Sequence, residues 1–217
     1  MTQEAVWKLF NFMLEASAVT GKLFFFTLLI GLPLGLILAL GRMSRWVVIS
    51  FPIRIYLLIM RGTPLILQLF FFYFGTAYIF KVRIMERFTA AVVAMGLNYA
   101  AYFAEIYRSG IQSMPRGQYE AATVLGFTKR QTFQKIILPQ VIKRILPPMG
   151  NEFMTLVKDT ALVNCIGVAE IYLVATDTMS SQNSIVPLIM AGAFYLVMNS
   201  VVSRCMNIAE KKLDYYR

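Results

Sequence analysis

The sequence predicts an all-α integral membrane protein, and its composition and apolar runs lead to that class. Of the 217 residues, 58% are hydrophobic and only 15% are charged. A soluble domain has about a quarter of its residues charged. Several apolar runs reach the roughly 20 residues that a helix needs to cross a bilayer. The length fits a single domain, residues 1–217, of about five spanning helices.

The apolar runs place five predicted spans. They cover residues 16–40, 64–80, 88–107, 141–168 and 185–208. The second span is expected to begin with Thr63 as its N-cap and Pro64 in its first turn, after an interfacial piece at 54–60. Adjacent prolines, Pro147 and Pro148, are expected to break the fourth span. A short helix is expected at 166–176, before the fifth span.

Loop charges set the expected orientation. The first loop is basic, and the segment 108–144 carries seven basic residues against one acid, Glu120. The last outer loop has Glu170 and Asp177 and no base. The positive-inside rule therefore places the N-terminus outside and the C-terminus in the cytoplasm of a multi-pass plasma membrane protein. The loop 81–87 opposes this orientation, since it has three basic residues and one acid on the proposed outer side.

A polar segment between the third and fourth spans then lies on the cytoplasmic face. It predicts two short helices, at 120–125 and 129–137. Gly126 lies at the bend, where freedom at positive φ lets the chain turn. Thr128 and Gln131 match a capping box for the second helix, and Pro139 is expected to end it. From periodicity alone, an amphipathic loop on anionic lipid and a projecting docking element fit this segment equally well.

Polar residues inside the spans are costly and therefore indicate either a transport pathway or internal pairs. Asn98, Tyr102 and Glu105 share one face of the third span. The fourth span has a polar stripe over residues 151–159. Pairing is expected for Glu105 with Arg108 and for Lys158, and the remaining polar residues are open to both interpretations. The candidate pathway residues are Gln68, Asn98, Tyr102, Glu152, Thr155 and Asp159.

The middle segment resembles the EAA loop of ABC importer permeases. The matching residues are Glu120, Ala121, Ala122, Gly126, Ile136, Leu138 and Pro139. Further motifs resemble permeases for polar amino acids of the histidine, glutamine and lysine-arginine-ornithine type. These motifs are Arg61-Gly62-Thr63-Pro64, Ala101-Tyr102-x-x-Glu105-Ile106-x-Arg108, Gly117-Gln118-x-Glu120, Leu138-Pro139-Gln140 and Lys158-Asp159-Thr160.

The resemblance implies a type I ABC importer permease fold whose segment 115–139 is a coupling helix. Such a permease forms the pathway of an ATP-driven, binding-protein-dependent amino-acid importer in the bacterial inner membrane. It implies a cytoplasmic ATPase dimer that holds ATP and Mg, a second permease that is the same or paralogous, and an external solute-binding protein. This chain itself is then expected to bind no cofactor.

Several activities are excluded or left open by the residues themselves. The chain has no G-x-x-x-x-G-K-[ST] phosphate loop, so it is not expected to be an enzyme that hydrolyses ATP. It has no histidine and only Cys165 and Cys205, which are expected to be free thiols, so no metal site is expected. A permease for another small solute, a passive channel and a membrane scaffold remain alternatives. The amino acid itself stays undetermined.

Overall fold

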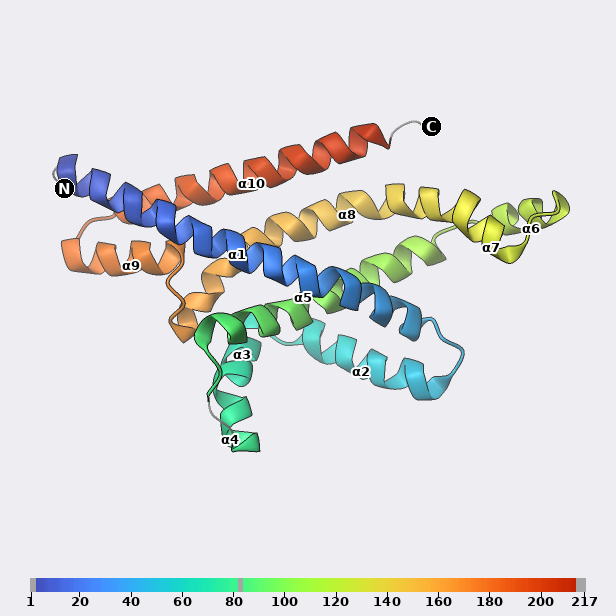
Figure 1. Ribbon diagram of the computed structural model, residues 1–217, viewed down its shortest axis with the longest axis horizontal. Helices are drawn as coiled ribbons and strands as arrows, with labels where there is room; N and C mark the ends of the chain where they lie inside the picture. The colour runs from blue at the N-terminus through green and yellow to red at the C-terminus, as the bar shows by residue number, and fades with distance from the viewer. Residues whose placement is uncertain (1–2, 82–83, 214–217) are drawn as a thin grey trace.

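Every regular element in the computed structural model, which describes residues 3–81 and 84–213, is a helix (Figure 1). Val82 and Arg83 of the predicted loop 81–87 and the tail 214–217 lie outside the described residues. In chain order the elements are α1 (Gln3–Arg42), α2 (Val47–Gly62), α3 (Leu65–Phe70), η1 (Phe71–Gly75), α4 (Thr76–Phe80), α5 (Arg87–Gln112), α6 (Arg116–Val124), α7 (Lys129–Gln131), η2 (Thr132–Ile137), α8 (Leu138–Asp159), η3 (Thr160–Ile166), α9 (Ile171–Gln182) and α10 (Val186–Lys212). Both η1 and η2 are π-helical, and η3 is a 3₁₀ helix. The predicted all-α class is confirmed.

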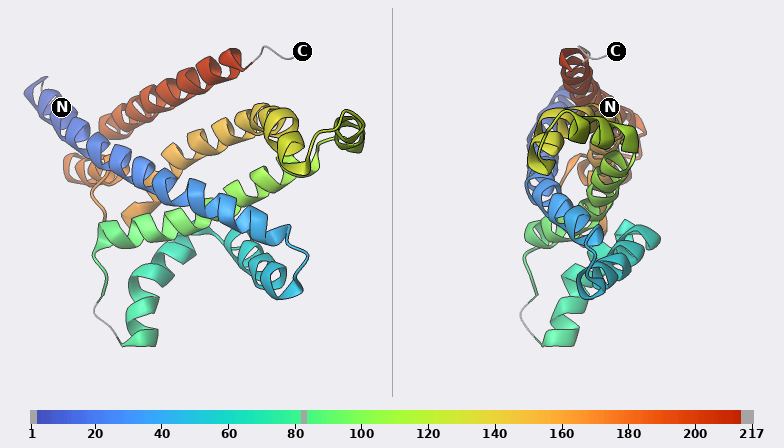
Figure 2. Two further views of the ribbon diagram at one scale, coloured as in Figure 1. Left: turned by 45° about the vertical axis from the view of Figure 1, so that its right-hand side comes forward. Right: turned by 90° about the vertical axis from the view of Figure 1, so that its right-hand side faces the viewer.

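The long helices α1, α5, α8 and α10 form a bundle that runs along the length of the molecule (Figures 1 and 2). One end of the bundle carries α6 and α7, and the opposite end carries the N-terminus and α9. The α3–α4 segment leaves the bundle sideways (Figure 2). The predicted coupling segment therefore projects from one end, where another protein can reach it.

Small residues let α1 approach α5 closely. Gly31 and Gly35 lie about one turn apart on α1 and face α5. A Cβ on Gly35 would lie 2.8 Å from the Cβ of Phe103 and 3.0 Å from the carbonyl oxygen of Ala100. Pairs of small residues four positions apart favour such contacts in membranes, where association depends on van der Waals packing. The largest core cluster surrounds this contact and draws side chains from α1, α3, α5, α8 and η3.

The second predicted span, 64–80, is the α3–η1–α4 segment, and the chain turns by 110° between α2 and this segment. The expected interfacial piece belongs to α2, a helix of 16 residues. The predicted N-cap at Thr63 is wrong, because Thr63 ends α2 instead. Its N–H and its hydroxyl both donate to the carbonyl oxygen of Ile59, at 3.1 and 2.8 Å. Threonine hydroxyls readily bond the carbonyl four residues earlier, and Pro64 then stands before α3 as its N-cap.

Helix α8 continues where Pro139 was predicted to end a helix. Pro139 lies in the first turn of α8, and the helical path runs without a break from Lys129 to Ile166. The π-helical turn η2 comes directly before it, and there the Leu138 N–H bonds to the Phe133 carbonyl oxygen. Pro139 has no N–H to donate, and the wider π-helical turn directly before it accommodates such a residue.

The expected break at Pro147 and Pro148 is also wrong, since both prolines lie inside α8. Packing holds the helix together there, because Gly150 is buried against Met206 of α10 and an added Cβ would lie 3.3 Å from its methyl carbon. The chain bends later, after η3, where Gly167 has a φ of +73°. The helices on either side of that bend differ in direction by 56°.

By length and composition, α1 and α10 can each cross a membrane, and two bent pairs raise the number of candidates in the described part to as many as four. The third predicted span is α5, whose 26 residues extend about 39 Å and exceed the roughly 30 Å of a bilayer core. Helix α1 begins at Gln3 instead of near residue 16. Its first turns are helical because Leu9 and Met13 pack on α9 and α10.

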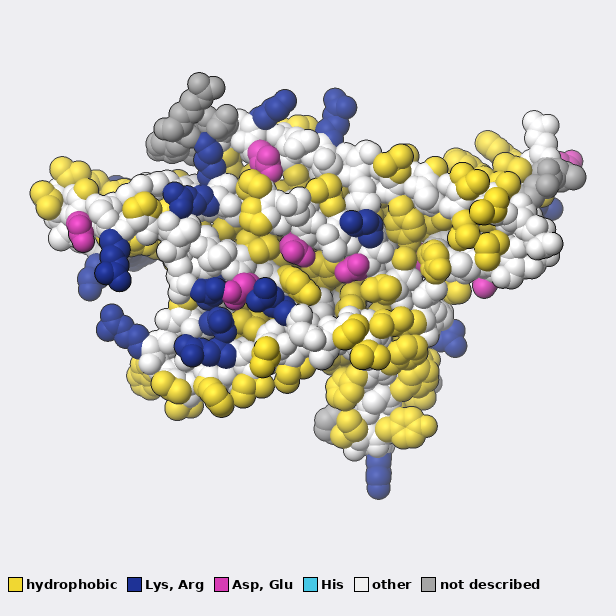
Figure 3. Space-filling view, turned by 180° about the vertical axis from the view of Figure 1, so that it is seen from behind, with side chains coloured by type: hydrophobic (Ala, Val, Ile, Leu, Met, Phe, Trp, Pro, Cys, Tyr) yellow, Lys and Arg dark blue, Asp and Glu magenta, His cyan; other side chains and the backbone are white. Residues whose placement is uncertain are grey.

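Large apolar side chains on the outer faces of α1, α2 and α10 are exposed. Val48 of α2 is 85% exposed and Leu196 of α10 is 69% exposed. Figure 3 shows apolar side chains spread over one face of the molecule, with basic side chains gathered in groups. Apolar patches of this extent indicate a surface that lies in lipid or against another protein.

Candidate functional site

The candidate coupling segment forms a compact turn between two short helices. Helix α6 ends at Val124, and Gly126 then adopts the left-handed conformation with a φ of +78°. At the start of α7, the Gln131 N–H donates to the Thr128 hydroxyl oxygen at 3.3 Å. The Thr128 N–H donates in turn to the side-chain oxygen of Gln131 at 2.9 Å. The predicted bend and the predicted capping box are both confirmed.

The tip of this segment is open to solvent and partly apolar. Glu120 and Ala121 are exposed, and so are Val124 at 87% and Leu125 at 73%. Ala122, by contrast, is 1% exposed and packs inside the segment. A solvent-facing surface of apolar side chains beside one carboxylate suits docking by another protein, since nothing in the described part of the chain covers it.

Polar and apolar contacts fix the base of the segment to the bundle. The side-chain amides of Gln118 and Gln140 donate to one another's oxygen atoms at 2.8 and 2.7 Å. The Arg144 guanidinium donates to the Ser113 carbonyl oxygen at 2.8 Å. A small core of buried residues fills the space beneath, made of Met114, Ile137 and Val141.

The remaining predicted coupling residues lie at this base instead of at the tip. Ile136 packs against the small core beneath the segment. Leu138 is 36% exposed, and Pro139 is half-buried. These three residues thus join η2 to α8 and lie apart from the exposed surface of α6.

Two candidate pathway residues, Gln68 and Asn98, hold the junction between α2 and α3. The Gln68 amide donates to the Met60 carbonyl oxygen at 2.9 Å and to the Thr63 hydroxyl at 2.8 Å. The Asn98 amide donates to the same Met60 oxygen at 3.0 Å and to the side-chain oxygen of Gln68 at 2.9 Å. Both side chains are buried. They supply partners for the carbonyl groups that the bend frees at the end of α2.

Two acidic residues of α8 lie on one face and point to a second site. Glu152, Thr155 and Asp159 recur at i, i+3 and i+7, and Glu152 and Asp159 are both half-buried. The buried Tyr99 of α5 donates its hydroxyl to an Asp159 carboxylate oxygen at 2.8 Å. Glu152 lies about two helical turns before Asp159 on the same face of α8. The Thr155 hydroxyl donates within its own helix, to the Asn151 carbonyl oxygen at 3.0 Å.

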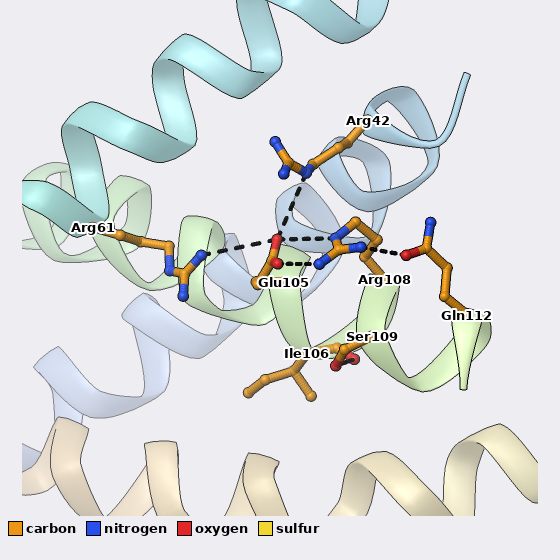
Figure 4. Close-up of polar contacts among 7 residues, drawn as sticks. All are labelled: Arg42, Arg61, Glu105, Ile106, Arg108, Ser109 and Gln112. Carbon is orange, nitrogen blue, oxygen red and sulfur yellow. Dashed lines mark hydrogen bonds and ion pairs between the residues drawn. The ribbon is translucent and has the colours of Figure 1, made fainter. Parts of the chain in front are cut away.

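Glu105 is the centre of a basic cluster contributed by three helices (Figure 4). Its carboxylate accepts two hydrogen bonds from Arg108, three residues later, which confirms the predicted pair. Arg42 from the end of α1 lies 3.7 Å from the same carboxylate, and Arg61 from the end of α2 lies 3.9 Å from it. The Arg61 guanidinium also lies 5.6 Å from the ring centre of Tyr102, which is half-buried.

The sequence did not single out Tyr99 or Arg42 as functional residues. Tyr99 resembles the other aromatic residues of an apolar helix, and only the fold brings it to Asp159, which lies 60 positions away. Arg42 counts only as a loop charge until α1, α2 and α5 are seen to converge. No spacing rule within a single helix could have found either contact.

Comparison with known protein families identifies the chain. The family described as binding-protein-dependent transport system inner membrane component matches residues 31–215. The chain belongs to this family. It is therefore a permease subunit of an ABC importer, and in such systems another subunit carries the ATPase site. This membership supports the importer interpretation over a passive channel or a scaffold.

Full-length relatives agree with this assignment. The permease is 38% identical over 203 residues to the arginine transport system permease protein ArtQ of Bacillus subtilis (strain 168), across 93% of this chain and 92% of ArtQ. It is 35% identical over 213 residues to the octopine transport system permease protein OccM of Rhizobium radiobacter, across 94% of this chain and 87% of OccM.

Solved structures give the same fold. A chain in the crystal structure of an amino acid ABC transporter with histidines is 36% identical, with a TM-score of 0.89 over 98% of the permease and 99% of that chain. A chain of the MetNI methionine ABC transporter, in an inward-facing conformation, has a TM-score of 0.73 at 20% identity over 98% and 99% of the two chains. The permease therefore has the predicted type I ABC importer fold.

Proposed function

We propose that this permease pairs with a second permease, docks on an ATPase dimer through residues 115–139, and imports amino acids that carry a positive charge. The coupling half of this proposal is supported by the exposed tip around Val124 and Leu125. Closure of the ATPase dimer on ATP and Mg moves the two coupling segments together. The permeases then change from inward-facing to outward-facing and accept an amino acid from the solute-binding protein.

The same geometry supports the proposed orientation. The coupling segment lies at one end of the bundle, and the N-terminus lies at the other (Figure 1). An ATPase is supplied with ATP only in the cytoplasm, so the α6–α7 end faces the cytoplasm and the N-terminus faces outward. Charge supports this arrangement, because the segment 108–144, which contains α6 and α7, carries seven basic residues against one acidic residue.

The substrate class rests on one observation, the pair of acidic residues on α8. Glu152 and Asp159 share a face of the helix, and Tyr99 fixes the Asp159 carboxylate by a hydrogen bond of 2.8 Å. Two carboxylates in a half-buried setting are costly unless a cation joins them. A guanidinium or ammonium side chain supplies that cation. The relatives are named as arginine, octopine, glutamine and L-cystine transport proteins, so their names do not select one substrate class. The negative charge of the α8 site is what favours a cationic substrate.

The test is ATPase activity of the permease reconstituted with its ATPase and binding protein, measured with individual amino acids. Arginine, lysine and ornithine are expected to stimulate activity, and glutamate is not. Gly126→Glu, which adds bulk and charge at the exposed tip, is expected to abolish stimulation while the permease still inserts into the membrane.

The two parts of the proposal fail in different ways. Strong stimulation by glutamate or glutamine and none by arginine would overturn the substrate class and leave coupling intact. Wild-type stimulation in Gly126→Glu would overturn the coupling role of the segment. If the ATPase does not bind the permease, the docking role of residues 115–139 is wrong.

A further inference from the structure

A basic cavity of about 500 Å³ opens between α1, α2 and α5. Arg42, Arg54, Arg61 and Glu105 line it, with Leu57 and Leu58 between them. It lies beside the end of α1 and the length of α2, on the side of the bundle that leads to α6 and α7 (Figure 1). Neither the coupling segment nor the acidic pair of α8 contributes a residue to this cavity.

The protein balances the charges that line this cavity only in part, because Arg42 and Arg61 share Glu105 at ion-pair distance and Arg61 also interacts with Glu152. Glu105 is its only acidic lining residue among those the structure describes, and its carboxylate is already bound by Arg108. Arg42 and Arg61 lie 3.7 and 3.9 Å from it, beyond hydrogen-bond length. Arg54 is exposed. Guanidinium groups that lack a full complement of acidic partners are costly to hold together, so an anion that neutralises them would be bound favourably.

Apolar surface of α2 continues directly from these arginines. Arg54, Leu58 and Arg61 recur at i, i+4 and i+7, so they lie along one stripe of the helix. Leu58 is 73% exposed, and the neighbouring outer face of α2 is apolar and exposed as well, including Phe51 at 58%. Trp46, 72% exposed just before α2, is a residue type that favours the membrane–water interface.

We propose that this cavity binds the phosphate headgroup of one anionic phospholipid, whose acyl chains lie along the outer face of α2. A guanidinium matches phosphate oxygens in a two-pronged geometry, and three of them converge here. A free phosphate or carboxylate would meet the charges but leave the apolar stripe unused. A zwitterionic lipid would meet the apolar stripe but would leave the excess charge uncompensated. An anionic phospholipid satisfies both.

The test is lipid retention by the purified permease in native mass spectrometry, with phosphatidylglycerol and phosphatidylcholine compared. We expect phosphatidylglycerol to be retained in preference. Arg54→Gln should weaken that retention about tenfold, as for the loss of one charge-assisted hydrogen bond. Arg45→Gln is the matched control, because Arg45 is an exposed arginine just before α2 that does not line the cavity. Equal thermal unfolding of both variants in phosphatidylcholine shows that neither change disturbs the fold.

Three results would overturn the proposal. Equal retention of the two lipids would show that charge plays no part. An equal loss in Arg45→Gln and Arg54→Gln would assign the effect to general surface charge. Displacement of phosphatidylglycerol by millimolar inorganic phosphate or glycerophosphoglycerol would show a site for a free anion, because neither competitor has acyl chains for the face of α2.

Discussion

Replacing Gly126 by alanine tests whether the turn of the coupling segment must take its observed form. Gly126 has a φ of +78°, and a Cβ built there meets no atom within 4 Å. The alanine therefore introduces no clash, and its cost is backbone strain of about 1–2 kcal/mol. That cost lowers the ratio of the observed turn to other conformations by about 5- to 30-fold. If the ATPase binds only this turn, its apparent Kd rises by up to the same factor.

The assay is equilibrium binding of the purified ATPase subunit to the permease in lipid nanodiscs, followed by stimulated ATPase activity. Gly117→Ala is the matched control. Gly117 also has open space around an added Cβ, but it lies in the regular helix α6. Gly117→Ala is expected to bind the ATPase as the wild type does. If Gly126→Ala and Gly117→Ala bind equally well, the left-handed turn is not what the ATPase requires.

Two further substitutions test the bundle and the acidic site. Gly35→Ala should lower the free energy of unfolding of the permease by about 1–3 kcal/mol relative to Gly21→Ala. The methyl group added at position 35 meets α5, whereas the one added at position 21 meets no atom within 4 Å. Thermal unfolding followed with a thiol-reactive dye measures the difference, and equal midpoints would refute the close contact. Tyr99→Phe removes the hydroxyl that donates a hydrogen bond to Asp159, and a hydrogen bond to a charged group contributes about 1.5–3 kcal/mol. The substrate concentration for half-maximal stimulation of the ATPase should therefore rise at least tenfold. Tyr107→Phe on the same helix is the control, and an equal effect in both would refute a specific role for this bond.

The coupling turn could be predicted from the sequence because its determinants are local. A glycine that permits positive φ and a threonine three residues before a glutamine act within one turn of helix, and the structure contains both features. The pair between Glu105 and Arg108 was predictable for the same reason. The five apolar runs all fall in helical segments, because a long apolar run is itself a signal for a helix of a membrane protein.

Contacts between distant segments could not be predicted in this way. The rule that proline ends helices predicted stops at Pro139 and at Pro147–Pro148, but π-helical geometry and packing on α10 keep α8 continuous. Helical spacing placed Asn98 in a polar stripe with Tyr102, whereas the fold uses the Asn98 amide to hold the α2–α3 junction. In each case, a tertiary contact decided what the local pattern left open.

The continuity of α8 has a mechanical consequence for the proposed coupling. From Lys129 to Ile166 the helical path extends about 55 Å, and it joins the exposed turn to the acidic pair at Glu152 and Asp159. A break at the prolines would absorb a displacement of the turn before it reached the acids. An unbroken helix transmits that displacement, and the Gln118–Gln140 amide pair makes α6 move with it. The Tyr99 hydroxyl then passes the motion to α5, so ATPase closure and rearrangement of the acidic site become one movement of the bundle.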